Sequence, residues 1–153
     1  MRTDLPEGWA EVPLGSVVQR VIDRRGRTPN ATESVESGIP ILTSSNVKMG
    51  RLVVPPGTTR VSEGFYEQWM GGERCRRGDI LITSAAPPGR VAQVPDDGPY
   101  GLGRRVLLIQ TNPEVVTSDF LVHQLAAEPF QRVLRANVTG TASQGITRSR
   151  LLN

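Results

Sequence analysis

The sequence is short of the residues that build common catalytic and metal sites. Its 153 residues include one cysteine, Cys75, and one histidine, His123. A single cysteine excludes an internal disulfide, and a zinc site needs about four Cys, His or carboxylate ligands at close spacing. No apolar run approaches the ~20 residues of a membrane span, and the first residues lack a secretory signal pattern. We therefore expect a cytoplasmic protein with no metal, no cofactor and no membrane partner.

Lysine is also nearly missing, because 17 of the 18 basic side chains are arginines and Lys48 is the exception. The formal net charge is only +3, yet the arginines gather in short groups. An arginine presents a rigid fork of donors that suits phosphates and guanine edges. These groups favour nucleic-acid binding, although clusters of this kind also occur on plain solvated surfaces.

The length and the 37% hydrophobic content indicate one domain, placed at residues 5–153. We predict an α+β fold in which a mixed, mainly antiparallel twisted sheet is flanked by several helices. Strands are expected over 39–42 and 52–54, in "GDILIT" with a strand returning after a Pro-Gly turn, and over 106–109. A short edge strand is expected around Trp9, Val12 and Leu14.

Three helical regions are predicted from apolar spacing and capping residues. The first is a short helix capped by Ser16, and the second follows Ser62 and ends at Gly71 and Gly72. The third begins at Thr117 or Ser118 and is divided by Pro129. Its apolar stripe is Leu121, Leu125, Phe130, Val133 and Leu134. Among the aromatic side chains, we expect Trp9, Tyr66 and Trp69 to lie in the core.

The residues supply no complete catalytic constellation. His123 lies inside a predicted helix beside apolar residues, where a packed or half-exposed histidine is the plain interpretation. Cys75 stands between Arg74 and Arg76, which would lower the pKa of its thiol. No partner orients it, so we interpret it as an incidental surface cysteine. We expect no catalytic residue and no enzymatic activity of the chain by itself.

Several separated stretches, read in order, resemble a known family. They are "LPEGWAEVPLGSVV", "GRTPN", "SGIPILTSSNVKMGRL", "RRGDILITSAAPPGRVAQV", "DFLVHQLAAEPFQRVL" and "TGTASQGITRSRLLN". Together they resemble a target recognition domain of the DNA specificity subunit of Type I restriction-modification systems. The resemblance runs from about Leu5 to Asn153.

The resemblance implies that the chain reads one half of a bipartite site in double-stranded DNA. Specificity subunits usually carry two such domains separated by long helices, which set the spacing and dock methyltransferase subunits, while a motor subunit cleaves DNA. This sequence matches one domain and stops at "RSRLLN", where the family normally continues into the spacer helix. Docking to the methyltransferase and self-association therefore stay open.

Four polar segments are the candidate DNA contacts. The segment after the last long helix offers hydroxyl donors for phosphates, a glutamine suited to adenine or phosphate, and an arginine. Base reading is expected on "DRRGRTPN", "TSSNVKMGR" and "TSAAPPGR", although each residue there is more often solvated or phosphate-bound. The candidates are Arg24, Arg25, Arg27, Thr28, Asn46, Lys48, Arg51, Ser84, Arg90, Thr139, Thr141, Ser143, Gln144 and Arg148.

Two other functions stay open at the level of the sequence. The chain is alternatively an interaction module that docks a methyltransferase or another specificity subunit without reading DNA. A second alternative is a small enzyme with a site around His123 and Cys75. The segment at 139–148 has a plain alternative too, as a loop that ends a helix and packs the domain.

Overall fold

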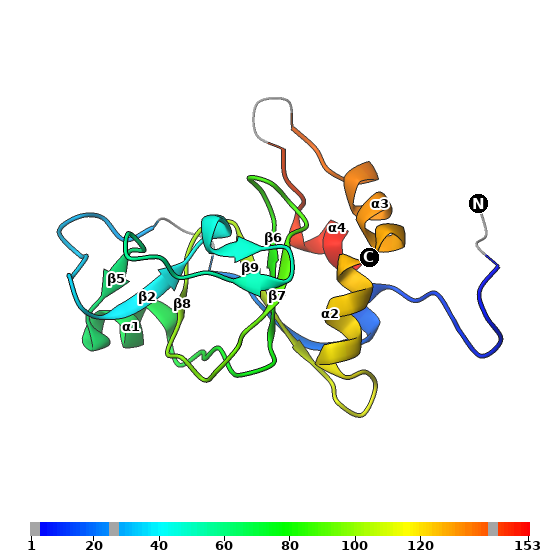
Figure 1. Ribbon diagram of the computed structural model, residues 1–153, viewed down its shortest axis with the longest axis horizontal. Helices are drawn as coiled ribbons and strands as arrows, with labels where there is room; N and C mark the ends of the chain where they lie inside the picture. Colours follow the sequence, from blue (N-terminus) through cyan, green and yellow to red (C-terminus); the bar gives the residue numbers. More distant parts are fainter. Residues whose placement is uncertain (1–3, 25–27, 141–143) are drawn as a thin grey trace.

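The computed structural model describes residues 4–24, 28–140 and 144–153 of the chain (Figure 1). Helices and mainly antiparallel strands share one body, so the expected α+β class is confirmed. In the described residues the strands form three small sheets, where the sequence predicted one.

The largest sheet has four strands, and each neighbouring pair in it is antiparallel. Its order is β1 (Val18–Ile22), β9 (Val106–Thr111), β6 (Ile80–Thr83) and β7 (Val91–Gln93).

A second sheet has three strands and contains a parallel pair. Its order is β5 (Arg60–Val61), β2 (Ile39–Leu42) and β8 (Gly101–Leu102), with β2 and β8 parallel. The third sheet is a hairpin of β3 (Val47–Lys48) and β4 (Arg51–Leu52). The hairpin packs on β7, where the Gly50 amide donates to the Val91 carbonyl at 2.8 Å.

The helices begin where their capping residues predict. Ser62 accepts a hydrogen bond from the Phe65 amide at 3.2 Å at the start of α1 (Glu63–Met70). Thr117 caps α2 (Ser118–Ala126) in the same way. Pro129 lies in the first turn of α3 (Glu128–Ala136), so the predicted division of this region is confirmed. A short α4 (Arg148–Leu152) follows at the chain end.

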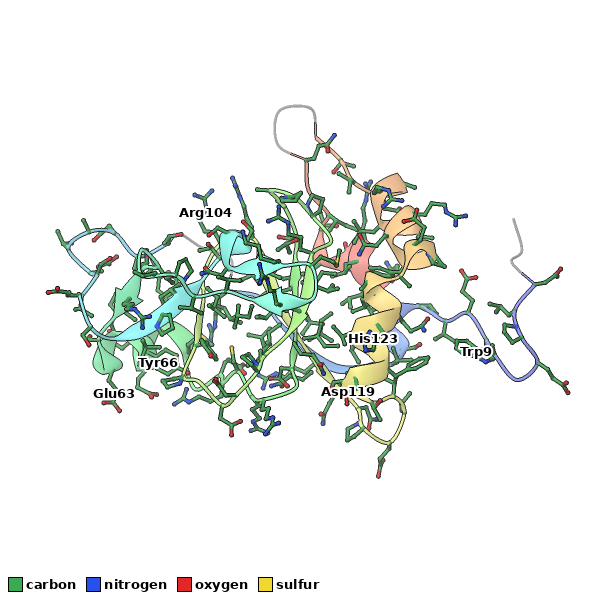
Figure 2. The ribbon with its side chains drawn as sticks, in the orientation of Figure 1. Trp9, Glu63, Tyr66, Arg104, Asp119 and His123 are labelled. Carbon is green, nitrogen blue, oxygen red and sulfur yellow. The ribbon has the colours of Figure 1, made fainter. Side chains whose placement is uncertain are left out.

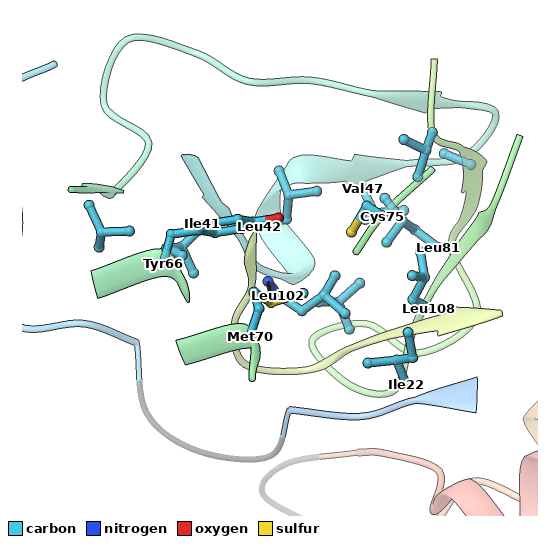
Figure 3. Packing of buried hydrophobic residues seen from close by; sticks show 14 residues of the cluster. Ile22, Ile41, Leu42, Val47, Tyr66, Met70, Cys75, Leu81, Leu102 and Leu108 are labelled. Carbon is cyan, nitrogen blue, oxygen red and sulfur yellow. Dashed lines mark hydrogen bonds between the residues drawn. The ribbon is translucent and has the colours of Figure 1, made fainter. Parts of the chain in front are cut away.

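The four-stranded sheet is buried on both faces, which explains its uninterrupted apolar strands. Ile80 and Ile82 of β6 pack with α2, α3 and α4 on one face. Leu81, between them, packs with β2, β8 and α1 on the other face (Figure 3). The same alternation holds in β9, where Leu107 and Leu108 belong to opposite cores. Successive strand residues point to opposite faces, so both must be apolar.

Four predictions about the apolar residues are wrong. Residues 18–22 form β1 rather than a helix, because their β-branched side chains suit a pleated strand. Trp9 is 51% exposed and lies outside the core, in contact with Phe120 at 5.9 Å between ring centroids. Its neighbourhood, residues 9–13, is not a strand. Val133 is exposed on α3, whereas Leu134 is buried.

Candidate nucleic-acid interface

The topology of the four-stranded sheet brings several polar segments to one end. β1 and β6 run in one direction, and β7 and β9 run in the other. The carboxyl ends of β1 and β6 therefore meet the amino ends of β7 and β9. Asp23 follows β1, residues 84–90 connect β6 to β7, and Arg104 and Arg105 precede β9.

Backbone hydrogen bonds join these segments to one another. The Ser84 amide donates to the Arg105 carbonyl at 3.0 Å, and the Ser44 amide donates to the Arg104 carbonyl at 3.3 Å. The turn before β9 thus holds both the β6–β7 connection and the short helical turn Ser44–Asn46 that leads into the β3–β4 hairpin. The relative positions of the three segments are set by main-chain contacts rather than by flexible side chains.

The segment after α3 joins the same end of the sheet. Thr139 and Gly145 exchange two backbone hydrogen bonds, at 2.9 and 3.0 Å, and the Ile146 amide donates to the Ser84 carbonyl at 2.8 Å. A Cβ at Gly145 would lie 3.1 Å from the Ser84 carbonyl oxygen, so this close approach requires a glycine. Figure 1 shows the segment rising beside the β6–β7 connection.

These segments line an open surface pocket of about 490 Å³. Leu107 and Ile146, both largely buried, are its apolar lining. Its polar and charged lining comes from the residue after β1, the β6–β7 connection, the turn before β9 and the segment after α3: Asp23, Ser84, Arg104, Arg105, Thr139, Thr147 and Arg148. The pocket therefore carries three guanidinium groups and one carboxylate.

The three pocket arginines make no side-chain hydrogen bond or ion pair with any described residue. Arginines elsewhere are often paired: Arg74 binds Glu67 at 2.6 Å, and Arg60 donates to the Gly38 carbonyl at 2.9 Å. Further paired arginines are Arg20 with Glu73, Arg135 with Glu128, and Arg150 with the Asn137 carbonyl. The pocket keeps its positive charge available to a ligand.

Two exposed acidic residues lie away from the pocket arginines. Arg104 lies on the upper edge of the molecule in Figure 2, whereas Glu63 and Asp119 lie on the lower edge. These two acidic side chains do not cover the arginine-bearing end of the sheet, where Asp23 is the carboxylate that lines the pocket.

Backbone strain is stored beside the pocket. Arg105 has a φ of 65° and Ala86, in the adjoining connection, has a φ of 59°. A side chain in the left-handed region costs about 1–2 kcal/mol, and a glycine would remove that cost. Such outliers gather at ligand-binding sites, because surrounding contacts hold them in place.

The β3–β4 hairpin adds cations next to this end of the sheet. Lys48 and Arg51 are directly opposite each other in the hairpin, and Arg90 lies at the start of β7, on which the hairpin packs. Arg51 is exposed, and Lys48 and Arg90 are half-buried. Their charged groups form no ion pair with a carboxylate among the described residues, so they extend the unpaired positive surface.

Two predicted contacts have structural roles instead. Asn46 is 4% exposed, and its amide nitrogen donates to the Val53 carbonyl and the Thr58 hydroxyl while its oxygen caps the turn at Thr43. Both amide hydrogens of Asn46 are therefore engaged within the protein, and its contact with DNA stays a prediction. Arg24 donates to the Met70 carbonyl at the end of α1, away from the pocket.

The other predicted residues have more varied positions. Ser84, Thr139 and Arg148 line the pocket, Gln144 is exposed beside it, and Thr28 is half-buried. Four more predicted residues, Arg25, Arg27, Thr141 and Ser143, lie outside the described residues.

Sequence reasoning missed Arg104 and Arg105 as site residues. Both are exposed pocket residues on a two-residue turn between Gly103 and β9. The available signal was the pair of arginines directly before a buried strand. It was weak because a solvated turn has the same composition.

The cysteine and the histidine do not form a site. Cys75 is 3% exposed, so the prediction of a surface cysteine is wrong. Burial, with Asp79 nearby, raises the pKa of its thiol to about 12, opposite to the expected effect of the flanking arginines. His123 is exposed on α2. The described part of the chain contains neither a metal-binding group of three or more His, Cys, Asp or Glu residues nor a helix suited to crossing a membrane.

Comparison with solved structures identifies the class of fold. The chain resembles a structure solved to explain complex assembly and conformational transition of the type I R-M system, with a TM-score of 0.67 at 21% identity. It resembles the HsdS subunit from Thermoanaerobacter tengcongensis with a TM-score of 0.63 at 24% identity. It resembles the S subunit of a Type I restriction-modification system from M. genitalium with a TM-score of 0.62 at 15% identity.

These matches cover 99% of this chain and 34%, 33% and 35% of the respective structures. The chain therefore has the fold of about one third of a Type I specificity subunit, and the resemblance expected from the sequence is confirmed at the level of the fold. No family model and no curated protein sequence matches the chain.

Proposed function

We propose that this chain is a target recognition domain of a Type I restriction-modification specificity subunit that reads one half of a bipartite site in double-stranded DNA. The observation that carries the proposal is the gathering of four segments, with unpaired cations, at one end of a rigid sheet. The likeness to specificity subunits supports it. DNA carries a dense row of phosphates, so an unpaired arginine surface is a suitable partner.

The contacts divide into two kinds in this proposal. The pocket residues hold the phosphate backbone, with Ser84 and Thr139 as hydroxyl donors beside the arginines. Lys48, Arg51, Arg90 and Gln144 lie on the adjoining segments and are the candidates for base edges, because arginine and glutamine form bidentate pairs with guanine and adenine. Arg25, Arg27, Thr28, Thr141 and Ser143 stay proposed contacts on the same physical grounds.

The proposed partners follow from this role. The chain supplies specificity and no chemistry, so methylation and cleavage belong to methyltransferase subunits and to a motor and restriction subunit in a cytoplasmic complex. Self-association, or attachment to further specificity segments, would bring a second half-site within reach of the same complex.

Selection of bound duplexes from a random pool tests the proposal. We expect enrichment of a motif of a few base pairs, with binding that weakens steeply in salt. Contact with about five phosphates gives a log–log slope near −4 to −5. Absence of an enriched motif, together with binding of a cognate methyltransferase in gel filtration, would instead favour a protein-interaction module.

A further inference from the structure

We infer that the pocket at the end of the four-stranded sheet is a clamp for a single phosphodiester group of the DNA backbone, held by Arg104, Arg105 and Arg148. The inference rests on the proposed function and narrows it. It assigns three side chains to one charge of the ligand, rather than to three separate phosphates along the duplex.

The charge of the pocket calls for an anion. Three guanidinium groups line it with Asp23 as the carboxylate among them, and the three have no partner among the described residues. Like charges that share a concave site repel one another, and the low-dielectric wall formed by Leu107 and Ile146 strengthens that repulsion. A bound phosphodiester relieves it.

The geometry fixes the two sides of the clamp relative to each other. Arg104 and Arg105 come from the turn before β9, and Arg148 comes from the segment after α3. Ser84 joins the two sides, because its amide donates to the Arg105 carbonyl and its carbonyl accepts from the Ile146 amide. The Ser84 hydroxyl lines the space between them and donates to no described residue.

The strained backbone at Arg105 supports a ligand-binding role for its side chain. A φ of 65° is the region that glycine adopts at least cost. An arginine at this position lowers the stability of the turn. In return, the turn places two consecutive arginines, Arg104 and Arg105, at the same pocket. A purely structural turn gains nothing from this arrangement.

A duplex backbone fits the surroundings of the pocket better than a free anion does. The pocket adjoins the cations of the β3–β4 hairpin and of Arg90, so a ligand seated in it can continue along the same surface. A lone phosphate would leave Lys48, Arg51 and Arg90 without a ligand, whereas a strand supplies further phosphates and base edges to them.

The salt dependence of binding to the selected duplex distinguishes two cases: the three arginines share one phosphate, or each of them contacts a phosphate of its own. The triple variant Arg104→Ala, Arg105→Gly, Arg148→Ala is expected to make the log–log slope shallower by about 0.9, and to weaken binding about eightfold at ~0.1 M salt. Three independent contacts would change the slope by about 2.7. A change near that value, or no change, overturns the inference. Duplex binding by the unaltered protein tests the proposed function separately.

Two controls keep the test specific. Arg77→Ala removes an exposed arginine at the opposite end of β6 and should leave the slope unchanged. Arg105→Gly alone should weaken binding while maintaining or raising the melting temperature, because it relieves backbone strain. If that variant does not fold, the double variant Arg104→Ala, Arg148→Ala carries the test: one shared phosphate predicts a slope change of at most about 0.9, and two independent contacts predict about 1.8.

Chemical probes of the DNA and of the ligand complete the experiment. One uncharged methylphosphonate linkage, moved along the duplex, should weaken binding by the unaltered protein at each contacted phosphate. At one of these positions it should have no effect on binding by the triple variant. An equal loss in both proteins at every position would contradict the clamp. Inorganic phosphate, added at constant ionic strength, should not displace the duplex, and displacement would assign the pocket to a free anion.

Discussion

Thr83 is the position where removal of one oxygen atom should most directly disturb the candidate interface. The side chain is fully buried at the end of β6. Its hydroxyl donates to the Pro87 carbonyl at 2.7 Å and accepts from the Arg90 amide at 2.9 Å. Its backbone carbonyl accepts from the Gly89 amide at 2.9 Å. One threonine therefore holds the whole connection between β6 and β7.

Thr83→Val keeps the shape of the side chain and removes the hydroxyl. The Arg90 amide then loses a partner in a buried setting, at a cost of about 1–3 kcal/mol in the free energy of unfolding. Pro87 is exposed, so water can replace the hydrogen bond to its carbonyl. The loss of that bond therefore adds little to the change in the free energy of unfolding. With an m-value of about 2 kcal/mol/M, a loss of about 2 kcal/mol lowers the urea midpoint by about 1 M.

Urea unfolding followed by tryptophan fluorescence measures this change, with Thr59→Val as the matched control. Thr59 is half-buried, and its hydroxyl makes no hydrogen bond with a described residue, so its variant should keep the original midpoint. At low urea, the folded Thr83→Val protein should also bind the selected duplex more weakly, because Ser84 and Arg90 shift. An unchanged midpoint and an unchanged affinity would refute the assigned role of the hydroxyl.

Three further substitutions and conditions have defined outcomes. Burial raises the pKa of Cys75 to about 12, so the folded protein should resist alkylation at neutral pH. Its stability should fall as pH rises from about 9, where the unfolded thiol ionises, toward 12. Cys75→Ala should remove the part of this decrease that begins near pH 9, whereas the part above about 10 remains, because burial also raises the pKa values of Tyr66 and Tyr100. Gly71→Ala should destabilise the fold by about 1 kcal/mol or more in thermal unfolding, because Gly71 has a φ of 58° and its added Cβ would lie 2.9 Å from an Arg24 nitrogen. Trp9→Ala should change the urea midpoint little, since the side chain is half-exposed, and a loss of several kcal/mol would contradict that placement.

Local features of the fold were predictable where one residue type decides the local backbone. Ser62 and Thr117 are capping residues, and both cap helices. Pro129 favours a first turn and lies in one. Long-range pairing was not predictable. Residues 17–22 fit a helical spacing and a strand equally well, and only the partner β9 decides for the strand.

The candidate site was predictable in its segments and much less in its residues. The segments were visible as polar interruptions between apolar runs, but their meeting at one end depends on the direction of each strand. Asn46 has the amide that suits adenine, yet the turn it caps uses that amide internally. Arg104 and Arg105 belong to the pocket only because β9 lies between β1 and β6 in the sheet.

The double burial of the four-stranded sheet has a consequence for how such a domain can change its target. Side chains of β6 and β9 pack in two separate cores, whereas the polar loops that connect the strands begin at the strand ends. Substitutions in those connections alter the ligand-facing surface at little expense to the packing beneath it. In the proposed DNA-reading role, small changes at the sheet end would exchange one recognised base sequence for another, while the scaffold that makes the protein fold stays the same.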